Sequence, residues 1–208
     1  MSVTSEEPGL NGLVLAGGRS RRMGTDKAGL RYGDDPRPQW KRMADLLRAV
    51  CGEVFLSIRR GQQLDNLEPG DAFRILEDPP ESEGPLTGFM EAFKTAPQSA
   101  WLVVACDLPL LHLPILKNLL VHRGSHTALA YRSAHDGLPE PMCAVYEPTM
   151  RPVLETALAD GFRCPRRILI NQKDVVQLLD LPDPNALENA NTPDEFKRLS
   201  LLLKGIST

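Results

Sequence analysis

The chain has 208 residues, 42% hydrophobic and 25% charged, which predicts one ordinary globular domain over residues 11–208 after a flexible lead-in at residues 1–10. The net charge of −3 gives no global basic field, so nucleic acid is not expected as a partner. No apolar run is long enough to span a membrane and the N-terminus lacks a signal-peptide pattern, which predicts a cytoplasmic protein without membrane contact.

Apolar residues and turn signals predict strands that alternate with helices along the chain. Continuous apolar runs predict strands at residues 13–15, 54–58, 73–76, 101–106, 127–131, 142–146 and 175–179. Helical spacing, with prolines and glycines at helix ends, predicts helices at residues 40–50, 86–93, 114–122, 148–161, from 165, and from 193 to near 205. This order predicts an α/β fold, a three-layer sandwich around a mostly parallel Rossmann-like sheet with ligands at the carboxyl ends of its strands.

The first predicted strand runs into a loop that is rich in glycine and in basic residues and ends at Lys27. Glycines such as Gly17 and Gly18 let backbone N–H groups turn toward a ligand, and cations such as Arg22 and Lys27 suit the oxygens of a polyphosphate. It is no P-loop, because no Ser or Thr follows Lys27, and its adjacent glycines break the spacing of a dinucleotide loop. The loop predicts a triphosphate cradle, with a glycine- and arginine-rich surface turn as the alternative.

Asp107 directly follows the most hydrophobic predicted strand, residues 101–106. A carboxylate in that place lies at the ligand edge of the sheet, where it can hold Mg²⁺ together with phosphate oxygens. The alternative is that Asp107 caps the turn formed by the following Leu108 and Pro109. The sequence therefore predicts a Mg²⁺ ligand at Asp107 and leaves the capping role open.

The glycine-rich loop resembles the signature of the molybdenum cofactor guanylyltransferases, a group of the sugar-phosphate-type nucleotidyltransferases. Their pattern, Leu-Ala-Gly-Gly-x-Ser-x-Arg-Met-Gly-x-Asp-Lys, is matched at every specified position by residues 15–27. Later segments match in the family order: residues 84–88, with Thr in place of the usual Ala, residues 106–109, Cys-Asp-Leu-Pro, and residues 189–193, Asn-Ala-Asn-Thr-Pro. The resemblance covers nearly the whole chain and implies a single nucleotidyltransferase domain.

The resemblance implies an enzyme that transfers GMP from GTP to the phosphate of molybdopterin, with Mg²⁺ as cofactor. It implies the following nucleotide-binding residues: Leu15, Ala16, Gly17, Gly18, Lys27, Asp78, Gly84, Leu86 and Asp107. Catalytic roles fall to Lys27, Arg22 and Asp107, with Asp107 as the metal ligand and Asn191 near the phosphates or the metal. Asp78 would accept hydrogen bonds from guanine or ribose, with an ordinary turn acid as the alternative. For the motif around Asn191 the alternative is helix capping, because residues 192–195 have the spacing of a capping box. Other cofactor-biosynthesis proteins and client apoenzymes are further candidate partners.

The acceptor side departs from the family pattern. Many members carry a His before a proline where this chain has Glu140 and Pro141, and residues 33–38 lack the usual Gly-Lys-Pro. The polar loop at residues 132–141 is expected to border the acceptor pocket. Three alternatives stay open: a transferase for another base or acceptor, such as a CTP-dependent one, a non-catalytic GTP-binding accessory protein, and an interaction module without nucleotide.

The expected choice of base rests on Gly17. Because it has no Cβ, Gly17 leaves room for the exocyclic amine of guanine, whereas the related cytidylyltransferases carry Leu-Ala-Ala-Gly at this point. A site that pairs with the donors of guanine leaves buried groups unpaired when another base enters, at about 1–3 kcal/mol per lost partner. We therefore expect GTP to be preferred over CTP and ATP.

Overall fold

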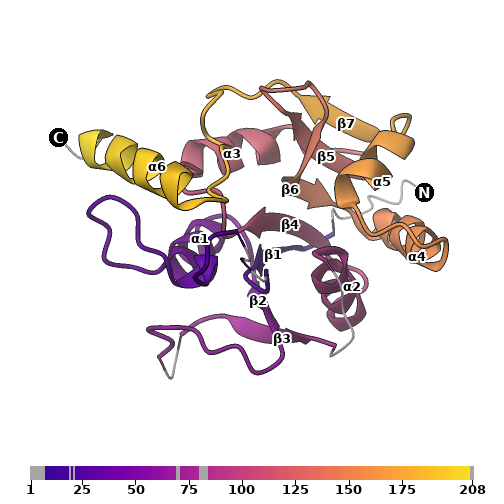
Figure 1. Ribbon diagram of the computed structural model, residues 1–208. Coiled ribbons are helices and arrows are strands. Elements are labelled where there is room, and N and C mark those ends of the chain that lie inside the picture. The colour runs from indigo at the N-terminus through magenta and orange to yellow at the C-terminus, as the bar shows by residue number, and fades with distance from the viewer. Residues whose placement is uncertain (1–7, 19, 21, 69–70, 80–83, 207–208) are drawn as a thin grey trace.

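The computed structural model describes residues 8–18, 20, 22–68, 71–79 and 84–206. A seven-stranded sheet in the order β3-β2-β1-β4-β6-β5-β7 forms its middle layer (Figure 1). The strands are β1 (Leu10–Leu15), β2 (Val54–Arg59), β3 (Arg74–Asp78), β4 (Ala100–Ala105), β5 (Ala128–Arg132), β6 (Pro139–Tyr146) and β7 (Val176–Leu179). Only β6, within the described residues, runs antiparallel to its neighbours, so the mostly parallel sheet predicted from the sequence is confirmed.

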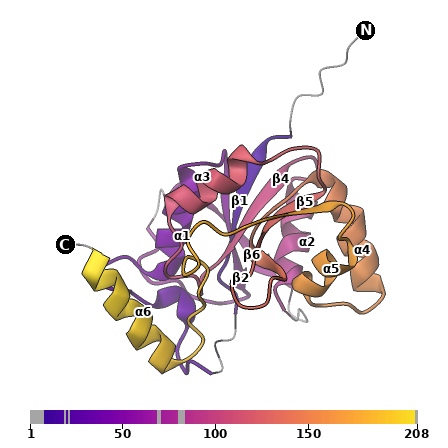
Figure 2. The same ribbon diagram turned by 90° about the horizontal axis from the view of Figure 1, so that it is seen from above.

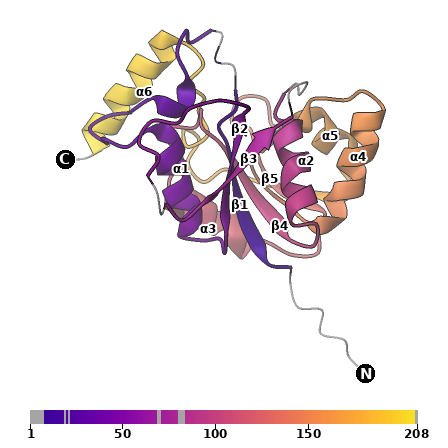
Figure 3. The same cartoon turned by 90° about the horizontal axis from the view of Figure 1, so that it is seen from below.

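Helices cover both faces of the sheet, which completes the predicted three-layer sandwich (Figure 3). One face carries α1 (Gln39–Arg48) and α3 (Leu113–Val121), and the other carries α2 (Leu86–Thr95), α4 (Arg151–Ala159) and α5 (Pro165–Asn171). Short 3₁₀ turns lie at Lys27–Gly29 and Pro148–Met150. The last helix, α6 (Pro193–Ile206), lies beside α1, on the opposite side of the molecule from α4 and α5 (Figure 2). None of the helices in the described part of the chain is long and apolar enough to cross a bilayer.

The central strands are buried on both faces, which explains why they read as unbroken apolar runs. Side chains alternate between the two faces along each strand. In β4, Leu102 and Val104 contact the cluster under α1 and α3, whereas Trp101 and Val103 contact the cluster under α2. Because the core fixes these strands from both sides, the loops at their carboxyl ends start from rigid positions.

Two strands begin three residues earlier than the sequence predicts. β1 starts at Leu10 rather than residue 13, although it includes the buried polar Asn11, whose side chain accepts a hydrogen bond from Glu53 N at 3.4 Å. β6 starts at Pro139 rather than residue 142. The polar loop predicted at residues 132–141 is therefore shorter than expected, because the prolines of β6 lie beyond the residues that pair with β4 and leave that ladder intact.

The contacts between the N-terminal segment and the rest of the fold begin at an earlier residue than the sequence predicts. Residues 1–7 of the predicted lead-in lie outside the described part. Pro8 O accepts a hydrogen bond from Arg123 at 2.8 Å, and Gly9 O accepts one from Ala100 N at 2.9 Å. The sheet therefore includes the last residue of the segment predicted to be flexible, Leu10.

Candidate active site

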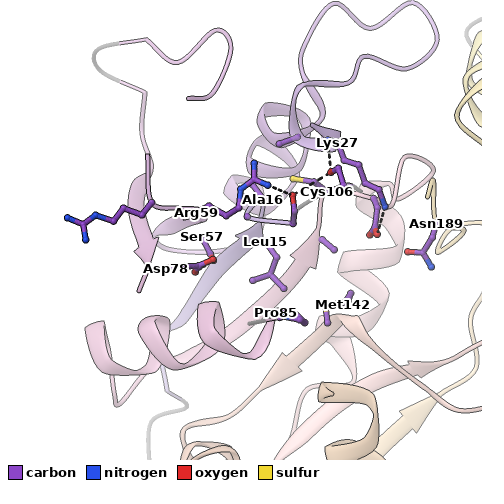
Figure 4. Close-up of a pocket in the computed structure, with 18 of the residues that line it drawn as sticks. Leu15, Ala16, Lys27, Ser57, Arg59, Asp78, Pro85, Cys106, Met142 and Asn189 are labelled. Atoms are coloured by element: carbon purple, nitrogen blue, oxygen red, sulfur yellow. Dashed lines mark hydrogen bonds and ion pairs between the residues drawn. The ribbon is translucent and has the colours of Figure 1, made fainter. Parts of the chain in front are cut away.

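A cavity of about 790 Å³ opens at the carboxyl ends of β1, β2, β3 and β4, the edge predicted to bind ligands (Figure 4). Predicted site residues that line it are Leu15, Ala16, Gly17, Gly18, Lys27, Asp78, Gly84 and Asp107. Figure 4 shows Lys27 and Asn189 on one side of this cavity and Ser57 and Asp78 on the other. Its two ends therefore differ in chemistry, with the ion pair of Lys27 and Asp107 at one end and the half-buried carboxylate of Asp78 at the other.

The glycine-rich loop folds back on itself through Ser20. This residue has a φ of +46°, in the left-handed region, and its carbonyl accepts hydrogen bonds from Met23 N and Gly24 N at 3.0 and 3.1 Å. Its hydroxyl accepts a hydrogen bond from Lys27 N at 3.1 Å. These contacts return the chain to the strand edge at Lys27. The neighbouring Arg19 and Arg21 of the signature lie outside the described residues.

Lys27 joins residues that lie far apart in the sequence. Its Nζ contacts Asp107 Oδ2 at 3.3 Å and Asn191 Oδ1 at 2.7 Å. Arg22 Nη2 donates to the same Asn191 oxygen at 3.5 Å, so the four predicted residues meet at one place. The side chains of Lys27 and Asp107 are 16% and 26% exposed, which weakens solvent screening of their attraction.

Asn191 serves helix capping and the site at once. Asn191 N and Thr192 N donate to Glu195 Oε2 at 2.7 and 3.0 Å, and Glu195 N donates to Thr192 Oγ1 at 3.3 Å. These bonds form the predicted capping box and hold the pKa of Glu195 below its usual range. The backbone of Asn191 is thus used for capping, which leaves its side-chain oxygen to contact Lys27.

Asp78 forms the other end of the cavity. Ser57 Oγ donates to Asp78 Oδ1 at 2.9 Å, and burial raises the pKa of the Asp78 carboxyl. A Cβ added at Gly17 would lie 2.7 Å from Asp78 Oδ2, and one added at Gly88 would collide with Ser57 Oγ. The space beside Gly17 therefore borders the Asp78 carboxylate, and the expectation that it accommodates the exocyclic amine of guanine stays a prediction.

Leu86 does not fit its predicted role. Its side chain is fully buried in the core cluster under α2, and the cavity at this point is lined by Gly84 and Pro85. The sequence motif placed Leu86 correctly at the start of the helix, but helical spacing turns its side chain toward the sheet. The whole residue is buried, so Leu86 supports the start of α2 and offers no surface to the cavity.

The cavity also includes residues that the sequence did not single out. Ser57, Arg59, Met142 and Asn189 line it. Ser57 could have been found, because it is a polar residue inside an otherwise apolar strand, and Asn189 opens a motif already noted. Nothing in the pattern around Met142 indicates a site, since it reads as part of a core strand.

The donor set near Asp107 fits a magnesium ion that a nucleotide helps to hold. In the described part of the chain, no group of three or more His, Cys, Asp or Glu side chains is arranged around a metal position. Asp107 offers one carboxylate toward the cavity. Mg²⁺ is commonly bound by one or two carboxylates together with substrate phosphates. A single Asp beside a triphosphate cradle can therefore supply the protein ligand that such an ion needs.

A parallel sheet whose strand ends carry a glycine-rich loop, a lysine and a carboxylate around one cavity defines the nucleotidyltransferase class of α/β proteins. The chain belongs to the family described as the MobA-like NTP transferase domain, whose model matches residues 12–175.

Relatives and solved structures agree with this membership. The chain is 35% identical over 196 residues to the molybdenum cofactor biosynthesis bifunctional protein of Synechocystis sp., covering 92% of this chain and 54% of that protein. It thus spans about half the length of that relative. It is 31% identical to the probable molybdenum cofactor guanylyltransferase of Mycobacterium avium, covering 92% and 95% of the two chains. The crystal structure of molybdopterin-guanine dinucleotide biosynthesis protein A from Archaeoglobus fulgidus has the same fold, with a TM-score of 0.74, 21% identity, and coverage of 94% and 99%.

Proposed function

We propose that this protein transfers GMP from GTP to the phosphate of molybdopterin and releases pyrophosphate. The observation that carries the proposal is the convergence of Lys27, Asp107 and Asn191 at the end of the glycine-rich loop. The names of its relatives, molybdenum cofactor guanylyltransferases, support the same donor and acceptor. A nucleotide needs different partners for its base and for its phosphates, and the cavity is lined by Asp78 at one end and by Lys27 at the other.

In this proposal the base lies toward Asp78 and the triphosphate lies toward Lys27 and Arg22. An oxygen of the acceptor phosphate attacks the α-phosphorus, the bond from that phosphorus to the bridging oxygen breaks, and pyrophosphate leaves with the bonding electrons. The attacking phosphate is already anionic, so no general base is needed. The chain contributes mainly position and positive charge, which are the principal demands of phosphoryl transfer.

Asp107 is the residue that would hold Mg²⁺. When bound, the ion would neutralise negative charge on the phosphates. The ion pair between Asp107 and Lys27 keeps both side chains at the cavity edge before nucleotide arrives. A triphosphate would then give Lys27 a second anionic partner and free Asp107 oxygens for the metal.

We place the acceptor at a second cavity of about 200 Å³ that shares Met142 and Asn189 with the first. Its wall includes Arg166, which donates to Glu140 Oε2 at 2.9 Å and to Asp136 Oδ2 at 3.0 Å. Glu140 stands where many family members were noted to carry His. The shared lining places an acceptor in this second cavity next to the nucleotide.

The assay that tests the function is pyrophosphate release with GTP, CTP or ATP, with and without molybdopterin. We expect release only with acceptor, and kcat/KM for GTP at least about tenfold above that for CTP and ATP because unpaired buried groups penalise the wrong base. Nucleotide binding without pyrophosphate release would identify an accessory protein instead. A higher kcat/KM for CTP would contradict the guanylyltransferase assignment and leave the fold unchanged.

Gly17→Ala extends this test of base choice. The added methyl group would lie 2.7 Å from Asp78 Oδ2 and 3.2 Å from Arg59 N, so the mobile carboxylate has to yield rather than the backbone. We expect the ratio of GTP to CTP efficiency to fall. Gly124→Ala is the control, because a Cβ at Gly124 meets nothing within 4 Å and Gly124 does not line the cavity.

Asp78→Asn should separate binding from stability. The raised pKa means that the ionised carboxylate costs folding free energy above that pKa and costs nothing below the ordinary value of 3.8. The variant should therefore melt at or above the wild-type temperature at pH 7, and the difference should vanish as the pH falls toward 3.8.

The affinity of Asp78→Asn for GTP should fall about tenfold, since the amide turns a donor toward the donors of guanine. Asp180→Asn, at an exposed position, is the control. Unchanged GTP affinity in Asp78→Asn would remove Asp78 from base recognition.

Cytoplasmic location and contacts with other cofactor-biosynthesis proteins or client apoenzymes are part of the proposal. They follow from the proposed reaction, whose product has to be delivered to another protein. The single-domain organisation over residues 11–208 belongs to it as well. Co-purification of the chain with tagged client apoenzymes is the direct measurement of such contacts.

A further inference from the structure

Two side chains from the end of β2 hold the glycine-rich loop. Arg59 is the last residue of β2, and Gln62 follows it in the next turn. Neither belongs to the signature at residues 15–27. Both nevertheless contact that loop at its beginning and at its end.

The amide of Gln62 has a partner for each of its groups. Its Nε2 donates to Ala16 O at 3.0 Å and to Asp26 Oδ2 at 2.8 Å. Its Oε1 accepts a hydrogen bond from Arg59 N at 3.0 Å, which fixes the amide relative to the strand. One side chain thus links the first part of the loop, the last part of the loop and β2.

Arg59 repeats this link with its guanidinium group. Its Nη1 donates to Gly18 O at 3.0 Å, and its Nη2 contacts Asp26 Oδ2 at 3.2 Å. The other oxygen of Asp26 accepts a hydrogen bond from Ala28 N at 3.0 Å and caps the turn that begins at Lys27. Asp26 is therefore held on both oxygens, directly beside Lys27.

These contacts set the direction of groups that face the cavity. In a trans peptide the N–H points opposite to the C=O, so fixing Ala16 O toward Gln62 also fixes the direction of Gly17 N–H. Fixing Asp26 in turn fixes the start of the turn from which the Lys27 side chain extends. The backbone at Gly17 lies near Asp78, the base end of the cavity, and Lys27 lies at its phosphate end.

We infer that Gln62 is a positioning residue that sets the spacing between the base-contacting backbone at residues 16–18 and the phosphate-contacting Lys27. It acts through Ala16 and Asp26 and does not touch the substrate. The inference rests on the proposed function in so far as the ligand is a nucleotide. Its distinctive consequence is that Gln62 matters most for a ligand that occupies both ends of the cavity.

The test compares Gln62→Ala with Gln63→Ala, the same truncation at the exposed neighbouring residue. Binding of GTP, GMP and inorganic tripolyphosphate is measured by calorimetry, and kcat and KM are measured by pyrophosphate release. In Gln62→Ala we expect the Kd of GTP to rise about tenfold, and the Kd of GMP and of tripolyphosphate to rise by less than about threefold each, because prearranged spacing benefits only the ligand that spans it. The value of kcat should also fall, since the α-phosphorus is no longer held in line with the acceptor.

A second variant keeps the size of the side chain and changes only its hydrogen-bonding groups and charge. Gln62→Glu keeps the shape of the side chain but places a carboxylate against Ala16 O and Asp26 Oδ2, so it should weaken GTP binding more than Gln62→Ala does. If Gln62→Ala and Gln62→Glu both had the same Kd for GTP and the same kcat as Gln63→Ala, the inference would be overturned. Equal losses for GTP and for the two fragments would overturn it as well, because they would indicate general loosening of the loop. If the wild-type chain binds another nucleotide better than GTP, the proposed function fails, and the same comparison with that nucleotide and its fragments still decides the role of Gln62.

Discussion

Lys27→Ala is expected to lower kcat for pyrophosphate release about 100-fold, the usual cost of losing one preorganised donor to a developing negative charge. Lys27 Nζ lies within 3.3 Å of Asp107 and 2.7 Å of Asn191, so its position is fixed before substrate binds. The substitution removes this cation and leaves Asp107 facing the incoming triphosphate without a counter-charge. GTP affinity should fall too, because ground-state phosphates lose the same partner.

Lys41→Ala is the matched control for this variant. Lys41 also forms a partly buried ion pair, with Asp71 at 3.2 Å, but its nitrogen lies away from the cavity. We expect Lys41→Ala to keep wild-type kcat and Lys27→Ala to keep a near wild-type melting temperature. Near-normal turnover in a folded Lys27→Ala protein would remove Lys27 from the mechanism.

Asp107→Ala is expected to abolish the Mg²⁺-dependent part of turnover, a loss of at least about 100-fold, because it takes away the carboxylate proposed to hold the metal. Initial rates are measured across a Mg²⁺ titration at saturating GTP. Affinity for GTP should be reduced but retained, since the backbone at Gly17 and Gly18 and the carboxylate of Asp78 remain. The hydrogen bond from Ala190 N to the backbone oxygen of residue 107 is unaffected by the change.

Asp183→Ala provides the comparison for Asp107→Ala. Asp183 forms a surface pair with His112 at 3.4 Å and does not line the cavity. It should leave both the rate and its Mg²⁺ dependence unchanged. If Asp107→Ala retained a wild-type Mg²⁺ titration curve, the metal would have to be held by other groups.

The fold could be predicted because the burial of each strand and helix determines its pattern of apolar residues. Strands such as β2 and β4 are covered on both faces and read as apolar runs, and α1 shows a single apolar face toward the sheet. The boundaries that failed, at Leu10 and Pro139, involve polar residues or prolines whose tolerance depends on which neighbouring strand they pair with. Pairing partners are a property of the assembled sheet, which the local pattern does not contain.

The site could be predicted only in part, for a similar reason. The positions of three residues could be predicted, because Lys27 ends the signature, Asp107 directly follows an apolar strand and Asn191 lies within a matched motif. The sheet brings the first two together at its strand ends, and Asn191 contacts Lys27 there. The side chain of Leu86 was misplaced because the motif records its position but not the face it occupies on α2. Gln62 was missed because its importance comes from contacts with residues about 40 positions earlier, such as Ala16.

The close fit of Asp78 against Gly17 restricts how a lineage of such chains could exchange one base for another. A methyl group gained at position 17 would press on the carboxylate, which accepts a hydrogen bond from Ser57 on its other oxygen. An intermediate that gained the methyl group first would therefore carry a strained pocket suited to neither base. Evolution between purine and pyrimidine donors would have to remove the carboxylate first, passing through an ancestor with broad preference, before the glycine could be replaced.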